Sequence, residues 1–526
     1  MESANKSKCW WGVYAALLLV VLLWLPQLTI LSPKISFGDE GIVAQAARRI
    51  VQEEIPYRDF FCGITPGSFY WAAGFLAIFG KTFLALRLSV LATFILILLG
   101  ATLVLRRLNI RGLLGYLMTL SFLAFACGYW FIASHHWVSL ACCLFSLALL
   151  IQPDEATEKM GRSVILSGVA AALAAFSMQH KGAVWIIAVS IALCVGQPNG
   201  NQWARLKKFW FGVLLGSLPL VLFFISTVGM QQLVDQLIVF PLAQYHKIEG
   251  HQSIPLVKDL VLTWKTLSTS LPESAVYSDY LKYLIWLAGF LGRVIVHILP
   301  ALGLFALISL WRRPGVSRGN IALLTAFFVT LYLAALYRIH ETTLFFAAPA
   351  AVIVIVAAMG SAYSNNSTKG FGYQRVFSVA GAAWIGLFAW ISFGYFFMAF
   401  FLPTYTVKMP AGLVTSQFQD EAQALQEVDR LMRLNRKEGE PIFCYSYNPI
   451  FYFLLDADNP TPFDILVFPM NTQAQLDQAQ VLLEKSRCRW IVWDYTSLWL
   501  NSFGQYLTKN FELKARFSNV AIMERK

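Results

Sequence analysis

Two adjacent carboxylates, Asp39 and Glu40, are the residues of this sequence best placed for chemistry. Acidic residues are scarce in residues 1–403, and this pair comes a few residues after the first long apolar run. A carboxylate can act as a general base when it lies within hydrogen-bonding distance of the group that loses its proton. Alternatively, Asp39 could cap the helix that follows, and Glu40 could complement the dipole of that helix. The spacing leaves both interpretations open.

The segment after this pair has the hydrophobic period of a helix. Apolar residues recur at 42, 46 and 50 and at 43, 47 and 51, and the opposite face carries Gln45, Arg48, Arg49 and Gln52. Such a stripe predicts an amphipathic helix that lies along the membrane surface. Its N-terminus would hold the two carboxylates at that surface.

The composition excludes a water-soluble enzyme. Of the 526 residues, 57% are hydrophobic and only 13% are charged, whereas soluble domains carry about 25% charged residues. Aromatic residues make up 15% of the chain and often end apolar runs, as expected at a bilayer interface. Collagen-like and disordered chains are excluded on the same grounds.

The apolar runs predict an α-helical polytopic membrane protein with about eleven transmembrane helices, because a spanning helix needs about 20 apolar residues. The predicted spans are 10–31, 83–105, 112–132, 134–151, 163–179, 182–197, 208–228, 288–311, 319–337, 343–360 and 375–402. The run 67–80 is interpreted as a helix packed at the outer face or continuous with the next span.

Lysine and arginine residues determine the predicted orientation. The chain has a net charge of +12, and its excess of basic residues lies in short, alternate loops of residues 1–403. By the positive-inside rule these loops and the N-terminus face the cytoplasm. The outer face then receives a first loop at 32–82, a second large loop at 229–287 and the C-terminal residues. Basic loops of this kind do not form the stripe typical of nucleic-acid binding, so no nucleic-acid partner is expected.

Residues 404–526 differ in pattern from the transmembrane domain, residues 1–403. Strand-like segments at 441–447, 467–468, 489–495 and 517–524 alternate with helical patterns such as 472–486. This order predicts a small extracytoplasmic α/β domain docked on the outer membrane surface. The run 419–440 is interpreted as a solvated amphipathic helix.

The cysteine and histidine residues give no metal-binding pattern. Cys444 and Cys488 each lie on a predicted strand, which leaves a disulfide between them open. No C-x-x-C or H-x-x-x-H spacing occurs. His135 and His136 are adjacent and cannot share one helix face, so they are expected to line a cavity rather than to bind a metal.

Sharper motifs appear in residues 36–89 and 441–464. They are Asp-Glu after a span, an amphipathic helix, Pro-Tyr-Arg-Asp-Phe, Pro-Gly-x-x-Tyr-Trp, Phe-Gly-Lys, Ala-Leu-Arg-Leu-Ser and finally YNPIFYFLLDADNPTPFD. This series resembles C-type (GT-C) glycosyltransferases, in particular the bacterial protein-mannosyltransferase-like and aminoarabinose-transferase-like branch. The resemblance implies that Asp39 is the catalytic carboxylate, that Glu40 orients it or binds the acceptor, and that the donor is a polyprenyl-phosphate sugar.

Transfer from such a donor releases a polyprenyl phosphate, whose charge Arg or Lys must neutralise. The candidates for this role are Arg58, Lys81, Arg87, His180, Lys181, Arg338 and His340. Ordinary snorkelling to the interface is the alternative for each of them. The sequence departs from the family pattern at 64–67, where Ile-Thr-Pro-Gly stands in place of the usual Lys-Pro-Pro. Arg58 or Lys81 would therefore have to replace the missing lysine.

The sequence and this resemblance favour an inverting glycosyltransferase of the bacterial inner membrane. It would move a hexosyl or pentosyl group from a polyprenyl-phosphate donor to an envelope lipid, glycan or protein on the extracytoplasmic face, with Asp39 as general base. A non-catalytic assembly protein of the same fold is one alternative. A transporter or lipid flippase is another, although the expected intramembrane charges and inverted repeats are not visible. No cofactor is expected, and a divalent metal would have to draw on Asp39, Glu40 and Asp59.

Overall fold

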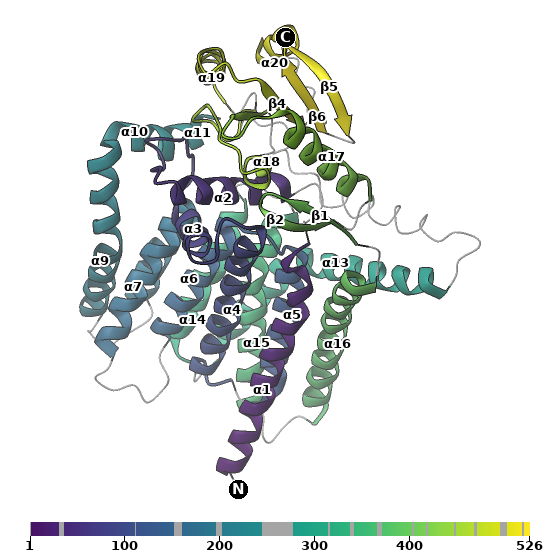
Figure 1. The fold of residues 1–526 in the computed structure, drawn as a ribbon. Coiled ribbons are helices and arrows are strands. Elements are labelled where there is room, and N and C mark those ends of the chain that lie inside the picture. Colours follow the sequence, from purple (N-terminus) through teal and green to yellow (C-terminus); the bar gives the residue numbers. More distant parts are fainter. Residues whose placement is uncertain are drawn as a thin grey trace.

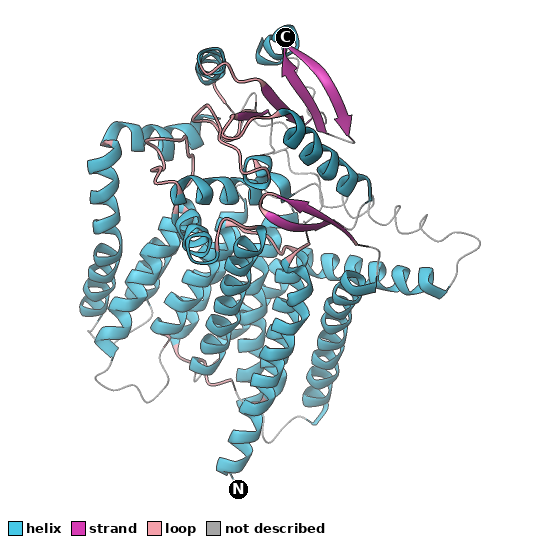
Figure 2. Cartoon of the chain, viewed as in Figure 1, coloured by secondary structure: helices cyan, strands magenta, loops and turns pink. Residues whose placement is uncertain are grey.

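The structure is a computed structural model, and it describes residues 2–30, 36–110, 112–151, 160–195, 202–244, 277–313, 316–336, 341–365, 371–401, 404–416, 419–445, 449–467, 471–494, 502–517 and 520–526. Figures 1 and 2 show a bundle of long helices with a smaller group of strands and helices at one end, which we call the outer end. The N-terminus lies at the opposite end of the bundle from the C-terminus, as an odd number of spans requires.

A helix lies at every predicted span. The helices are α1 (Glu2–Trp24, continued by the short η1, Leu25–Leu28), α4 (Phe83–Arg107), α5 (Leu113–Tyr129), α6 (His135–Leu150), α7 (Met160–Ser177), α8 (Gln179–Val195), α9 (Gln202–Val228), α13 (Tyr277–Arg312), α14 (Arg318–Leu336), α15 (Glu341–Asn365) and α16 (Phe371–Phe401). Within the described residues, six helical segments are long and apolar enough to cross a membrane, and the remaining predicted spans contain shorter apolar helices. The protein is a multi-pass membrane protein.

The run at 67–80 forms a separate helix, α3 (Gly67–Phe79), rather than an extension of the next span. Gly80 follows it with a φ of 87°, a conformation that glycine adopts without steric cost. Thr82 then caps α4, because its hydroxyl accepts a hydrogen bond from Ala85 N at 3.2 Å. At the outer end, α3 packs against α2 (Ser36–Val51), the amphipathic helix predicted after the first span.

A second group of short helices crosses the outer end after α9. The chain turns at Gly229, which has a φ of 94°, into α10 (Met230–Val234), the π-helical turn η2 (Asp235–Val239) and α11 (Phe240–Gln244). These helices form the beginning of the predicted second outer loop (Figure 1). Residues 245–276 of that loop lie outside the described residues.

The C-terminal region, residues 404–526, has the predicted mixture of strands and helices. A hairpin of β1 (Tyr405–Met409) and β2 (Gly412–Ser416) precedes a sheet of order β3-β4-β6-β5, in which β3 and β4 are parallel and the other neighbours are antiparallel. The strands of this sheet are β3 (Ile442–Tyr445), β4 (Trp490–Asp494), β5 (Phe511–Phe517) and β6 (Val520–Arg525). The helices are α17 (Gln419–Asn435), α18 (Ile450–Leu454), α19 (Gln473–Lys485) and α20 (Ser502–Asn510).

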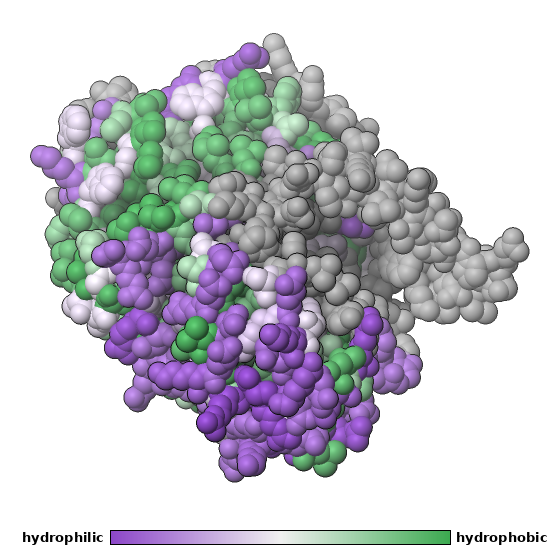
Figure 3. Space-filling model, turned by 90° about the horizontal axis from the view of Figure 1, so that it is seen from above, coloured by the Kyte–Doolittle hydropathy of each residue, from purple (hydrophilic) through white to green (hydrophobic). Residues whose placement is uncertain are grey.

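Three details of this region differ from the sequence interpretation. The predicted strand 517–524 is divided between Phe517, which ends β5, and β6, and β5 itself was not predicted. Val467 does not belong to a strand, because its N–H donates to the Asn471 side chain at 2.8 Å, in a turn; Phe468 lies outside the described residues. The β1–β2 hairpin was not predicted. Seen from above, hydrophilic residues gather over the C-terminal region, and hydrophobic residues cover much of the rest of the described surface on this face (Figure 3).

Cys444 and Cys488 are free thiols, and both are buried. Burial raises the pKa of Cys488 to about 12 and raises the pKa of Cys444 well above its usual range. Because the thiolate is the reactive form, we expect neither cysteine to be alkylated by iodoacetamide at pH 8 until the protein is unfolded. Mass spectrometry of alkylated peptides before and after unfolding in SDS without reductant measures this. A disulfide-linked peptide pair would contradict the structure.

Candidate active site at the N-terminus of α2

The helix α2 holds both carboxylates near its N-terminus. It begins at Ser36, so Asp39 lies inside the first turn rather than at the capping position. The interpretation of Asp39 as the helix cap is therefore wrong, although its charge still complements the helix dipole there. Asp39 is partly buried. Residues 31–35, immediately before the helix, lie outside the described part of the chain.

Glu40 is buried against Arg87 of α4. Its Oε2 accepts a hydrogen bond from Arg87 Nη2 at 3.0 Å, and its Oε1 accepts one from Ala133 N at 3.4 Å. The two side chains are 1% and 0% exposed. Arg87 Nη2 also donates to Ile30 O at 2.8 Å, and the guanidinium lies 4.8 Å from the ring centre of Phe83. Burial raises the pKa of Glu40 above its usual range, against the opposing effect of the Arg87 charge.

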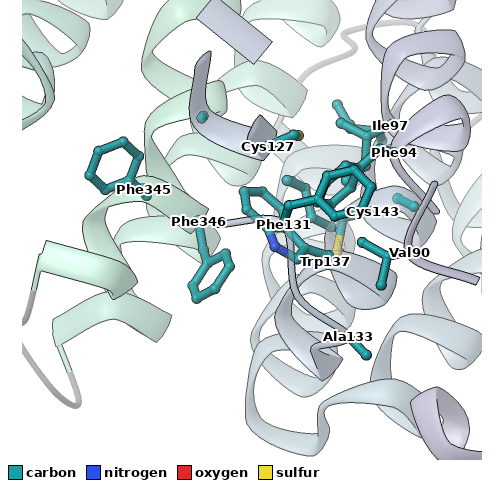
Figure 4. Close-up of a cluster of buried hydrophobic side chains, with 14 of the residues drawn as sticks. Val90, Phe94, Ile97, Cys127, Phe131, Ala133, Trp137, Cys143, Phe345 and Phe346 are labelled. Carbon is teal, nitrogen blue, oxygen red and sulfur yellow. The ribbon is translucent and has the colours of Figure 1, made fainter. Parts of the chain in front are cut away.

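An aromatic cluster supports the loop that carries Ala133 (Figure 4). Phe94 of α4 lies edge-on to Phe131 and Trp137, with ring centres 5.2 and 5.3 Å apart. Trp137 in turn meets Phe346 of α15 at 4.5 Å. Edge-to-face packing of this kind fixes ring positions, so the backbone N–H that meets Glu40 belongs to a well-packed segment between α5 and α6.

Lys181 of α8 lies near the same corner of the bundle. Its Nζ donates to His136 O at 3.2 Å, and the residue is only 2% exposed. His135 and His136 begin α6, directly after the Ala133 loop, and the His136 ring stacks on Phe346 at 4.3 Å. Within the described residues this buried ammonium has one carbonyl acceptor, which leaves further N–H donors for a ligand. Among the predicted cations that the structure describes, Arg87 contacts Glu40 directly, and Lys181 binds the backbone three residues after Ala133, whose N–H meets Glu40.

Arg58 and Lys81 lie towards the other end of α2. Arg58 pairs with Asp59 at 2.8 Å in the loop that follows the helix, and Lys81 lies 3.8 Å from Asp456 of the C-terminal region. Asp456 also pairs with Arg48, nine residues after Asp39. At 1.5 Å per residue this places the group about 14 Å from Asp39 along the helix axis.

The other predicted cations are less well defined. His180 is the second residue of α8 and is exposed. Arg338 and His340 lie outside the described residues. In the part of the chain that the structure describes, no group of three His, Cys, Asp or Glu residues is arranged to hold a metal ion. The roles assigned to the individual cations, and the absence of a cofactor, therefore stay predictions.

The polar face of α2 is covered rather than solvated. Arg48 Nε and Nη2 donate to Asp456 and Asp458 of the C-terminal region at 2.9 and 2.8 Å. Gly41 lies so close to α18 that an added Cβ would stand 2.6 Å from Ile450 N. The apolar face of α2 meets α3, so the helix is enclosed between the bundle and the C-terminal region. The hydrophobic period of the sequence predicted the apolar face of α2, but it did not predict the contact of the polar face with the C-terminal region.

Two cavities flank α2. One, with about 240 Å³ of empty space, lies between Val43, Trp71, Phe94 and the start of α6. The hydroxyl of Ser68 in its wall has no hydrogen-bond partner among the described residues. The other has about 570 Å³ of space and opens to solvent. Its walls come from α2, the first outer loop, α11 and the C-terminal region: Ile42, Ala46, Phe60, Phe61, Cys62, Gly63, Ile64, Phe69, Phe240, Asp464, Ile465 and Asn471. Mostly apolar walls with a few polar groups, at the junction of several parts, are typical of ligand sites.

Solved structures similar to this chain include two of ArnT. One is ArnT from Cupriavidus metallidurans bound to undecaprenyl phosphate, with a TM-score of 0.56, 12% identity and 97% of each chain covered. The other is ArnT from the same organism in the apo state, with a TM-score of 0.51, 14% identity, and 99% of this chain and 98% of that chain covered. This chain has the fold of ArnT. The ArnT-like fold extends over nearly the whole chain and agrees with the GT-C resemblance of the sequence. No protein-family model and no curated protein matches the chain.

Proposed function

We propose that this protein is a membrane glycosyltransferase that takes a sugar from a polyprenyl-phosphate carrier and transfers it, with inversion, to an envelope acceptor. The observation that carries the proposal is the Asp39–Glu40 pair at the N-terminus of α2, with Glu40 held by Arg87 and Ala133 N. The ArnT-like fold supports it, because an ArnT of that fold binds undecaprenyl phosphate. The inner membrane, with the C-terminal region on the periplasmic side, is part of the same proposal.

In this reaction Asp39 takes the proton of the acceptor hydroxyl as its oxygen attacks the anomeric carbon. The bond to the phosphate oxygen breaks, and the polyprenyl phosphate leaves with its charge. A single displacement inverts the configuration at that carbon. Glu40 is already paired with Arg87, so its role is to position α2 and Asp39 rather than to take the proton. Lys181 supplies positive charge to the leaving phosphate.

The test compares the envelope glycans and polyprenyl-linked sugars of a wild-type and a deletion strain by mass spectrometry. Loss of one glycan mass, together with accumulation of its lipid-linked sugar, supports a transferase and names the sugar. Loss of the glycan with its lipid-linked sugar confined to the inner leaflet would instead favour a flippase. Unchanged profiles in both fractions would favour an assembly protein.

Lys181→Met is expected to weaken binding of undecaprenyl phosphate to the purified protein by about tenfold, which corresponds to about 1.4 kcal/mol. The reason is that the buried Lys181 ammonium donates to the backbone of His136, next to the segment that contacts Glu40, and has further N–H donors for a phosphate. Titration of intrinsic tryptophan fluorescence with undecaprenyl phosphate measures the Kd. Lys207→Met, at an exposed position at the other end of the bundle, is the matched control. If binding of undecaprenyl phosphate weakens more in Arg58→Gln than in Lys181→Met, the phosphate binds near the C-terminal end of α2 instead.

A further inference from the structure

Arg49 is a buried arginine that uses most of its hydrogen-bonding capacity. It lies in the last turn of α2 and is 5% exposed. Nε and Nη2 each contact Glu54 Oε2 at 2.7 Å, and Nη2 also donates to Asp59 O at 3.1 Å. Nη1 donates to Asp464 Oδ1 at 3.0 Å and to Thr461 O at 3.4 Å. A guanidinium has five N–H donors, and Arg49 makes four hydrogen bonds here, with Nη2 also in ion-pair contact with Glu54.

These acceptors belong to separate parts of the chain. Glu54 and Asp59 are in the first outer loop, whereas Thr461 and Asp464 are in the C-terminal region. The Arg49 guanidinium also lies 4.7 Å from the ring centre of Phe60. Phe60 and Asp464 are both walls of the 570 Å³ cavity. One side chain therefore joins α2, the first outer loop and the C-terminal region around that cavity.

The two ends of α2 are held in different ways. Near the N-terminus, Glu40 is held by Arg87 of the bundle. Near the C-terminus, two buried arginines, Arg48 and Arg49, pair with carboxylates of the C-terminal region. The Arg48 partners Asp456 and Asp458 are 49% and 60% exposed, whereas the Arg49 partner Asp464 is only 11% exposed, so the Arg49 pair is the more deeply enclosed of the two contacts. A helix of this length behaves as a rod, so a displacement at one end is transmitted to the other.

We propose that Arg49 is a positioning residue for the transfer reaction: it sets the position of α2, and hence of Asp39, through the docked C-terminal region. This inference rests on the proposed function. It gives the C-terminal region a defined role, since that region supplies Asp464 and Thr461 as fixed points against which the helix is aligned. A displacement of a reacting group by about 1 Å can lower a rate by about a hundredfold.

The test uses Arg49→Lys in the full-length chain. Lysine keeps the charge but has three donors and no planar fork, so it cannot reach all the Arg49 acceptors. After induction in the deletion strain, the rate at which the product glycan reappears is divided by the amount of folded protein in the membrane. We expect this rate to fall about ten- to a hundredfold. Arg433→Lys is the matched control, because its pair with Asp429 at 2.7 Å stays within α17, and it should keep the wild-type rate.

Two further measurements test the positioning role of Arg49. If Arg49→Lys does not accumulate, Asp464→Asn replaces it, and this variant should also lower the rate per folded molecule. Hydrogen exchange at Asp39–Val43 should rise in either variant but not in Arg433→Lys. A wild-type rate per folded molecule, or unchanged exchange at Asp39–Val43, overturns the positioning role and leaves the transferase proposal intact. If wild type forms no glycan product, the transferase proposal fails, and the exchange result alone decides whether Arg49 controls the N-terminus of α2.

Discussion

Asp39→Asn is expected to remove the glycan product while the protein remains in the membrane at its normal level. Asparagine has nearly the same shape as aspartate but cannot accept a proton at neutral pH, and loss of a general base costs about 10²- to 10⁴-fold in rate. Complementation of the deletion strain, followed by mass spectrometry of the glycans and an immunoblot of the membranes, measures both quantities. The lipid-linked donor sugar should accumulate to the level found in the deletion.

Asp235→Asn is the matched control for this experiment. Asp235 is an exposed aspartate at the outer end, in η2, and no role in the reaction is assigned to it. It should restore the glycan fully. If Asp39→Asn restores the glycan at the wild-type rate, Asp39 only complements the helix dipole and the enzymatic proposal loses its main support.

Glu40→Gln is expected to give the largest loss of stability among single substitutions in this site. It leaves the Arg87 guanidinium, which is 0% exposed, without its counter-charge. Breaking one side of a buried ion pair costs about 3–5 kcal/mol, because the remaining charge stays buried and unpaired. The midpoint of thermal unfolding in detergent, together with abundance in the membrane, measures the effect.

Exposed ion pairs supply the comparison. Glu427→Gln breaks the pair with Arg430, whose side chain is 63% exposed, and should change stability by less than about 1 kcal/mol. The double variant Glu40→Leu with Arg87→Leu should recover part of the stability lost in Glu40→Gln, since no unpaired charge remains. A Glu40→Gln protein as stable as wild type would mean that water or lipid reaches Arg87.

The membrane architecture could be predicted from the sequence because it depends on local properties. A run of apolar residues long enough to cross a bilayer has few alternatives to a helix, since every backbone polar group must be satisfied within the segment. A helix lies at every predicted span, six of these helices are long and apolar enough to cross a membrane within the described residues, and both the amphipathic helix that became α2 and the α/β character of the C-terminal region are confirmed. The strand predicted at 467–468 was wrong at Val467, because two residues offer too little pattern to identify a strand.

The candidate site was predictable only in part. The sequence placed Asp39 and Glu40 on the N-terminus of one helix, because neighbouring residues stay neighbours in any fold. It gave no means of pairing Glu40 with Arg87, which lies on α4, or with the backbone of Ala133. Arg58 and Lys81 belong to the same outer loop in sequence, yet they lie near the opposite end of α2 because the helix separates them from Asp39.

By itself the sequence determined which segments cross the membrane, which helix carries the carboxylates and which face of that helix is apolar, because these properties arise within a few turns of chain. Only the tertiary structure decided that the polar face of α2 is a docking surface. Arg49 and Asp464 are 415 residues apart, and their contact at 3.0 Å depends on how the whole bundle folds. A charged side chain looks the same in sequence whether water or a partner carboxylate neutralises it, since both environments satisfy its charge.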